Sequence, residues 1–160
     1  MDFSSFFEYD QDGNGTGKPG AVFLGNLPEE DWSRLLSVAQ RRAFVAGEFL
    51  VRQGEQSRAF CIVASGRLEV FVTEDNGRER RIYDIEPLSI FGEQAFFDGL
   101  PRSANVRAYT AGELFAITPD AFEILSARYP DLTRQALLDL GRILSLRLRE
   151  ITTFMLRALR

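Results

Sequence analysis

The chain has 160 residues, 45% of them hydrophobic, and a formal net charge of −4 at pH 7, so we expect one domain with a sizeable core and no general affinity for nucleic acid. It has no histidine and a single cysteine, which excludes histidine-based metal sites, serine–histidine catalysis and an internal disulfide, and fits a reducing compartment such as the cytoplasm. No apolar run is long enough to cross a membrane, and no basic start followed by an apolar run indicates a signal peptide.

Residues 1–21 predict an N-terminal segment and a flexible loop. Residues 1–9 contain three phenylalanines, enough apolar surface to dock elsewhere, whereas residues 10–20 are polar and rich in glycine. Residues 10–15 resemble the first half of a calcium loop, but Ala21 stands at the twelfth position, where such a loop has glutamate. We therefore interpret this stretch as an acidic loop and expect no metal site.

Residues 22–130 predict a β-rich unit with flanking helices. The cap residue Asn26, the early Pro28 and the acids that follow are typical of a helix start, and the helix is expected to run to about Gln40. From Arg42 onward the hydrophobic period changes to two. The expected strands are residues 41–45, 48–52, 59–65, 67–74, 79–85, 104–110 and 113–118.

The order of these strands favours a particular fold class. Asn76-Gly77 between two alternating runs predicts a hairpin. Many short antiparallel strands with helices at both ends predict an α+β chain built on an antiparallel β jelly roll, or double-stranded β-helix. Cys61 lies inside an apolar run, so we interpret it as a small core residue and not as a nucleophile.

The stretch from Phe91 to Ala108 carries most of the chemistry in the sequence. Gly92 is expected to open a short helical turn that a ligand can approach closely, and the free amides of such a helix start can hold an anion. Arg102, expected at the start of the next strand, can pair bidentately with a phosphate. Glu93 accepts hydrogen bonds only, which suits a sugar hydroxyl.

This stretch resembles the phosphate-binding cassette of cyclic-nucleotide-binding domains, a family that includes bacterial catabolite activators and the regulatory subunits of cAMP-dependent protein kinase. The family pattern, an apolar residue, Gly-Glu and then Arg-small-Ala after a short gap, is filled, with Phe96 a mild departure where an aliphatic residue is usual. The resemblance covers about residues 22–155. It implies a site for cAMP, with cGMP as a further possibility, built from Phe91, Gly92, Glu93, Gln94, Ala95, Arg102, Ser103 and Ala104.

The resemblance also assigns roles within this set. Gly92 and Glu93 are expected at the ribose. The amides of Gln94 and Ala95 are expected at the cyclic phosphate, together with Arg102 and Ser103. No metal ligand and no catalytic residue is implied.

Two positions depart from the family pattern. Ser57 stands where glycine, alanine or cysteine is usual. In the turn before the cassette the family usually has Gly-Asp, whereas this chain has Leu88-Ser89, and a turn without that glycine is expected to take another backbone path. This departure favours a degenerate, nucleotide-free domain, while Glu93 and Arg102 argue against one.

Two helices are expected after the strands, residues 118–128 and a long one over residues 131–160. Its first part is expected to lie against the barrel, and the remainder overruns a small barrel, so we expect a parallel homodimer along this helix, as in the bacterial members of the family. The apolar stripe follows a heptad pattern. Its a positions are Leu137, Leu144, Ile151 and Ala158, and its d positions are Leu140, Arg147 and Phe154.

Arg147 and Leu148 are the positions that the resemblance places at the nucleotide base, where the catabolite activator family has a Thr-Ser pair. A guanidinium only donates hydrogen bonds, so it stacks on a base or donates to N7 and to a guanine O6. We therefore expect weaker discrimination of cAMP over cGMP. The alternative is that Arg147 extends out of the seam into solvent.

The expected function is a regulatory module that binds a cyclic nucleotide, most of all cAMP, and transmits occupancy through its C-terminal helix. An enzyme is not expected, because no nucleophile–base pair has sensible spacing. In the catabolite activator family a helix-turn-helix domain follows this helix, and we expect no DNA-binding domain in this chain. The alternatives are a nucleotide-free dimerisation module and the sensor fragment of a transcription regulator, and the downstream protein partner is open.

Overall fold

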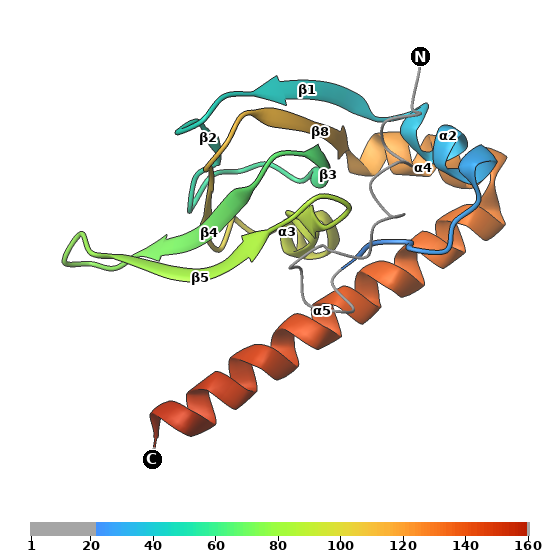
Figure 1. The fold of residues 1–160 in the computed structure, drawn as a ribbon. Coiled ribbons are helices and arrows are strands. Elements are labelled where there is room, and N and C mark those ends of the chain that lie inside the picture. Colours follow the sequence, from blue (N-terminus) through green and yellow to red (C-terminus); the bar gives the residue numbers. More distant parts are fainter. Residues whose placement is uncertain (1–21, 160) are drawn as a thin grey trace.

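The computed structural model describes residues 22–159, and the expected acidic loop and N-terminal segment lie outside them. Eight strands and four helices follow one another in this part of the chain (Figure 1). They are α2 (Glu29–Leu36), β1 (Gln40–Phe44), β2 (Phe49–Val51), β3 (Phe60–Ser65), β4 (Leu68–Thr73), β5 (Glu79–Ile85), β6 (Ile90–Phe91), α3 (Glu93–Asp98), β7 (Asn105–Ala108), β8 (Gly112–Ile117), α4 (Pro119–Arg128) and α5 (Pro130–Ala158).

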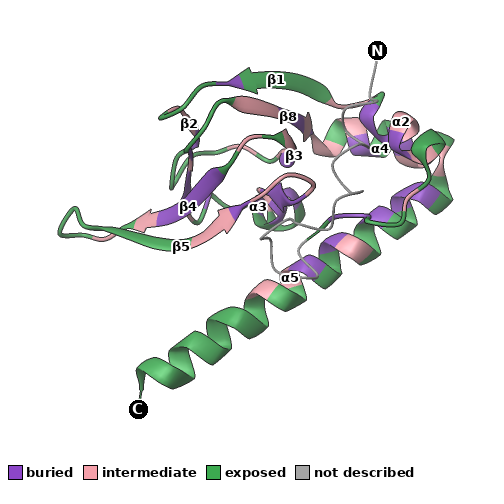
Figure 2. Ribbon diagram, in the orientation of Figure 1, coloured by how far each residue is buried: buried purple, intermediate pink, exposed green. Residues whose placement is uncertain are grey.

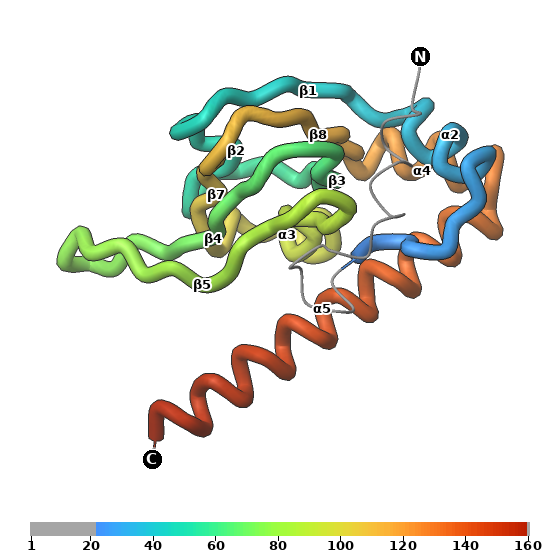
Figure 3. Tube along the Cα trace, in the orientation of Figure 1, coloured from blue at the N-terminus to red at the C-terminus, as the bar shows by residue number. Residues whose placement is uncertain are grey.

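The strands form two antiparallel sheets of four, in the orders β1-β8-β3-β6 and β2-β7-β4-β5. Strands far apart in sequence pair with each other, β3 with β8 and β4 with β7, which is how a jelly roll folds back on itself. The tube in Figure 3 shows this return, with β7 and β8 beside strands from the first half of the roll. The predicted antiparallel jelly roll with flanking helices and a long C-terminal helix is confirmed.

Two hydrophobic clusters hold the roll and the helices together. One lies between the sheets and includes Cys61, whose burial raises the pKa of its thiol to about 12 and confirms it as a core residue. The other joins β3 and β8 to the helices through edge-to-face aromatic contacts, among them Phe60 with Phe96 and with Phe122. Helix α3 contacts both β3 and α5, so it occupies the space between the roll and the last helix.

Most expected elements are found, and the expected strands start and end within two residues of the observed ones. The hairpin predicted from Asn76-Gly77 joins β4 to β5, with Gly77 at φ +81° donating its N–H to the Glu74 carbonyl. Strand β6 was missed, because two residues give no periodic signal. Among the described residues, none of the helices has the length and apolar composition to cross a bilayer.

The helix expected to reach about Gln40 is shorter, and this prediction was wrong. Helix α2 ends at Leu36, because Gln40 already pairs with Ala116 of β8 and the residues between must turn the chain into the sheet. The N-cap residue is Pro28, and no side chain caps this helix, so Asn26 does not have the expected capping role.

Helix α5 has two halves with different surroundings. Its first half packs on the aromatic cluster through Leu132, Ala136, Leu140 and Ile143, all buried. Beyond Leu144 the helix is mostly exposed and extends past the roll (Figure 2). The second half of α5 therefore leaves large apolar side chains exposed, among them Phe154, Met155 and Leu156.

Gly141 offers a test of the boundary between these halves. It lies inside α5 without a positive φ, and an added Cβ would meet nothing within 4 Å. We expect Gly141→Ala to raise the free energy of unfolding by about 0.5–1 kcal/mol, because alanine is the better helix former. Gly77→Ala is the matched control, since its Cβ also meets open space but its φ is +81°. Urea denaturation should show Gly141→Ala stabilised and Gly77→Ala destabilised, and a loss of stability in Gly141→Ala would contradict this description of α5.

Candidate functional site

A cavity of about 600 Å³ lies between the roll, α3 and α5. All of the residues that the sequence suggested for ligand binding line it: Phe91, Gly92, Glu93, Gln94, Ala95, Arg102, Ser103, Ala104 and Arg147. The structure therefore brings the cassette and a residue of the last helix to one place.

Gly92 shapes the floor of this cavity. It is the N-cap residue of α3 with φ +83°, and a Cβ at this position would lie 2.6 Å from Nη1 of Arg102 and 2.7 Å from the Ala59 carbonyl oxygen. Only glycine fits both the backbone conformation and the close approach of Arg102. No side chain caps α3 at this end, so its first amides are left for a ligand or water.

Arg102 lies three residues before β7, not at the start of that strand as expected, and is 6% exposed. Its guanidinium donates from Nε to the Ser57 hydroxyl at 2.9 Å, from Nη1 to the Gly92 carbonyl at 2.9 Å and from Nη2 to the Ala59 carbonyl at 2.7 Å. Burial lowers the pKa of this guanidinium from its usual value. Three of its five N–H groups are thus used within the protein, and two remain for a ligand.

Glu93 and Arg147 form a buried ion pair across the cavity. Nη1 of Arg147 lies 2.5 Å from Oε1 of Glu93, and the two side chains are 14% and 4% exposed. Nη2 of Arg147 donates to the Ile90 carbonyl at 2.6 Å, and the guanidinium lies 4.8 Å from the centroid of the Tyr83 ring. The alternative in which Arg147 extends into solvent is therefore wrong.

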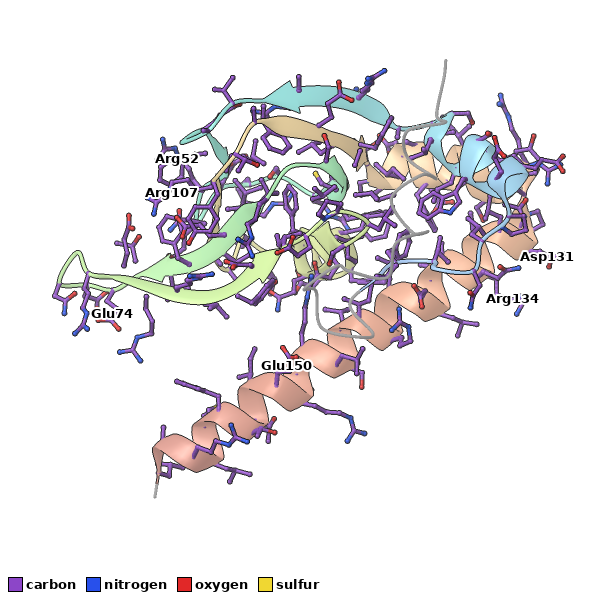
Figure 4. The ribbon with its side chains drawn as sticks, viewed as in Figure 1. Arg52, Glu74, Arg107, Asp131, Arg134 and Glu150 are labelled. Atoms are coloured by element: carbon purple, nitrogen blue, oxygen red, sulfur yellow. The ribbon has the colours of Figure 1, made fainter. Side chains whose placement is uncertain are left out.

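The charges around Arg147 reinforce this position. Burial alone would lower the pKa of Arg147. Tyr83, Glu93 and Glu150 favour its charged form, so the pKa of Arg147 is raised. Glu150 is labelled on α5 in Figure 4. Burial raises the pKa of Tyr83 to about 12, so its hydroxyl stays protonated at neutral pH.

The Ser103 hydroxyl donates to Oε1 of Gln94 at 2.5 Å, which joins the segment before β7 to helix α3. Both residues are exposed, whereas Phe91 and Ala95 are buried beneath them. A ligand that enters the cavity therefore meets polar groups at the surface and an apolar floor below.

In the turn before the cassette, Leu88 stands where the family pattern has glycine and takes a backbone conformation that glycine favours. Leu88 has φ +65°, the left-handed region that glycine takes most easily, at a strain of about 1–2 kcal/mol. Its N–H donates to the Val63 carbonyl at 2.8 Å, and Val63 donates to the Ser89 carbonyl at 3.0 Å. These bonds tie the turn before the cassette to β3.

Sequence reasoning missed several parts of the cavity. Tyr83 comes from β5, and Leu144 and Ile151 of α5 form an apolar wall together with Leu148, which the resemblance had placed beside Arg147 at the base. Side chains alternate between the two faces of a strand, so the sequence of β5 could have placed Tyr83 on the inward face. The sequence could not show that Tyr83 lies close to the cassette in space. Within residues 22–159, no group of three or more acidic or cysteine side chains is placed to hold a metal ion.

The sequence matches the family described as "Cyclic nucleotide-binding domain" over residues 41–129. It is 34% identical over 133 residues to the cyclic AMP receptor protein of Thermus thermophilus, a match that covers 83% of this chain and 59% of that protein. It is 29% identical over 101 residues to the type II regulatory subunit of the cAMP-dependent protein kinase of Drosophila melanogaster, over 63% of this chain and 26% of that subunit.

The fold agrees with this similarity. The crystal structure of the Thermus thermophilus catabolite activator protein superposes with a TM-score of 0.73 and 31% identity, over 82% of this chain and 60% of that one. The chain spans less than two thirds of the length of both relatives.

Proposed function

Because the chain belongs to the cyclic nucleotide-binding domain family, we propose that it binds a cyclic nucleotide, cAMP above all, as a regulatory module without enzymatic activity. One observation carries this proposal: Gly92, Glu93 and Arg102 line the same cavity, with the free amides of α3 beside them. The charges of its lining agree, since Glu93 and Arg147 neutralise each other and Arg102 is left as one net positive charge. A cyclic phosphate diester carries one negative charge.

In this proposal the phosphate binds to the two unused N–H groups of Arg102 and to the amides of Gln94 and Ala95. The Ser103 hydroxyl also donates to it, after rotating away from Oε1 of Gln94, which accepts its proton in this structure. Glu93 accepts from the ribose hydroxyl with the oxygen that Arg147 leaves unused. The base lies against Arg147 and the apolar side chains of α5.

In the same proposal, ligand binding affects α5 through the ion pair between Glu93 and Arg147. The ribose hydroxyl and Arg147 bind to one carboxylate, and Arg147 is a residue of α5. A ligand that binds to Glu93 therefore changes the contact that holds the exposed half of α5 to the roll. This supports signal transmission through the helix.

Arg147 gives a test of base selection. We expect Arg147→Thr to raise the ratio of cAMP to cGMP affinity by about five- to tenfold, because a hydroxyl accepts from the adenine amino group and a guanidinium does not. Calorimetric titrations with both nucleotides would measure this ratio, with Arg149→Thr, which lies outside the cavity lining, as the matched control. An unchanged ratio in Arg147→Thr would remove this residue from the base site.

Recovery of the ligand after incubation distinguishes the proposed function from two others, a phosphodiesterase and a nucleotide-free module. Incubation with cAMP, followed by chromatography, is expected to return bound and unchanged cAMP. Formation of AMP would indicate a phosphodiesterase, and absence of binding would indicate the nucleotide-free module. The same proposal places the chain in the cytoplasm, where the buried thiol of Cys61 fits the reducing conditions.

The assembly and the output also belong to the proposal. We expect a homodimer along the exposed half of α5, where Phe154, Met155 and Leu156 are 64%, 57% and 60% exposed. Because the relatives are longer than this chain, a sensor part of a longer regulator remains the alternative to a module that acts on a separate protein.

A further inference from the structure

The loop between β2 and β3, residues 52–59, surrounds Arg102 on two sides. At the backbone, Gly54 donates its N–H to the Arg102 carbonyl at 2.8 Å, and Arg102 donates its own N–H to the Glu55 carbonyl at 2.9 Å. At the side chain, Ser57 and Ala59 accept from the guanidinium. This short segment therefore fixes both ends of the residue that the proposed function places at the phosphate.

Ser57 has a distinct part in this arrangement, because among residues 22–159 it is the only side chain that accepts a hydrogen bond from Arg102. Its Oγ accepts from Nε at 2.9 Å, while the two Nη groups donate to backbone carbonyls. A guanidinium is planar, so three bonds in its plane determine where the remaining two N–H groups point. The Ser57 hydroxyl is thus one of three contacts that set the direction of the donors left for a ligand.

The same loop also contacts α3, the helix whose first amides the proposed function places at the phosphate. Arg58 donates from Nε to the Ala95 carbonyl at 3.2 Å and from Nη2 to the Phe96 carbonyl at 2.9 Å, which satisfies carbonyls at the C-terminal part of α3. At the opposite end of α3, Glu93, Gln94 and Ala95 line the cavity. Residues 57 and 58 thus connect the loop to the guanidinium and to the helix of the phosphate subsite.

We propose that Ser57 is a positioning residue, whose hydroxyl orients the Arg102 guanidinium for a ligand phosphate. This inference rests on the proposed function and adds to it a residue at a position where the sequence pattern of the family has a side chain without a hydroxyl. Ser57 is half-buried and does not line the cavity, so it acts through Arg102 and not by contact with the ligand.

The test compares Ser57→Ala, Ser57→Thr and Ser65→Ala. Ser65 is a matched control, because its hydroxyl also accepts one hydrogen bond, from the Glu113 N–H, but lies outside the cavity lining. The first measurement is the dissociation constant for cAMP by calorimetry. The second is hydrogen exchange of the Arg102 Nε–H by NMR in ligand-free protein, with that resonance identified by its loss in Arg102→Ala.

We expect Ser57→Ala to weaken cAMP binding by about five- to tenfold and to accelerate exchange of the Arg102 Nε–H, because a hydrogen bond to a charged group is lost. Ser57→Thr keeps the hydroxyl and should restore both, and Ser65→Ala should change neither. A purely structural role would change the melting temperature without changing Nε–H exchange below the unfolding transition.

Two results would overturn the inference. One is binding by Ser57→Ala within twofold of wild type, and the other is equal weakening by Ser57→Ala and Ser57→Thr. If the wild type binds no cyclic nucleotide, the proposed function fails on its own, and the exchange measurement then decides whether Ser57 orients Arg102, with unchanged exchange counting against it.

Discussion

Arg102→Ala is expected to weaken cyclic-nucleotide binding by about 2–5 kcal/mol, because it leaves a buried phosphate without its charged partner. The structure supports an effect of this size, since Arg102 is buried and provides the only net positive charge of the described cavity lining. Calorimetric titration would measure the loss. The Gly92 and Ala59 carbonyls also lose a donor, so a smaller decrease in stability should accompany it.

Arg134→Ala is the control for this variant. Arg134 is an exposed arginine near the start of α5, far from Glu150 along the helix (Figure 4). It should bind cyclic nucleotide like wild type. If Arg102→Ala is folded and also titrates like wild type, the assignment of the phosphate subsite is wrong.

The second large effect concerns assembly through α5. We expect the double variant Phe154→Glu, Met155→Glu to be monomeric, because it would bury like charges along an apolar seam. These side chains are 64% and 57% exposed and do not line the cavity, unlike Leu144 and Ile151, so assembly is tested apart from binding. Sedimentation velocity would report the change.

Leu138→Glu is the matched control for the seam. Leu138 is 66% exposed, but it lies on the half of α5 that packs on the roll. This variant should keep the oligomeric state of the wild type. A monomeric wild type would show that the exposed stripe of α5 does not form the proposed dimer.

The cassette could be predicted from sequence because its residues are close in the chain and its turns depend on local conformation. Gly92 opens α3 as expected, and Asn76-Gly77 forms its hairpin. The jelly roll followed from strand periodicity, because each inward-facing residue repeats at every second position. These features depend on residues that are close together in the chain, so their pattern is visible in a single sequence.

Contacts between distant elements could not be predicted in the same way. Glu93 and Arg147 are 54 residues apart, and only the packing of α5 on the roll brings them together. The heptad pattern placed Leu140 and Arg147 in a dimer seam, yet Leu140 is buried in the core and Arg147 lines the cavity. An apolar stripe predicts which face of a helix is buried, but it does not predict whether that face packs on the same chain or on a second copy.

The left-handed conformation of Leu88 was hidden for a related reason. Leucine disfavours this region, so the local sequence argued against it. The hydrogen bonds of Leu88 and Ser89 with Val63 hold the turn despite the strain. Tertiary contacts here override a local preference.

Calorimetric titration of the purified chain with cAMP, and in parallel with cGMP, tests the central claim most directly. The account predicts saturable binding with one nucleotide for each chain, and a smaller difference between the two nucleotides than a base site with hydroxyl side chains would give. A folded chain that shows neither binding heat nor a change in melting temperature with millimolar nucleotide would contradict it.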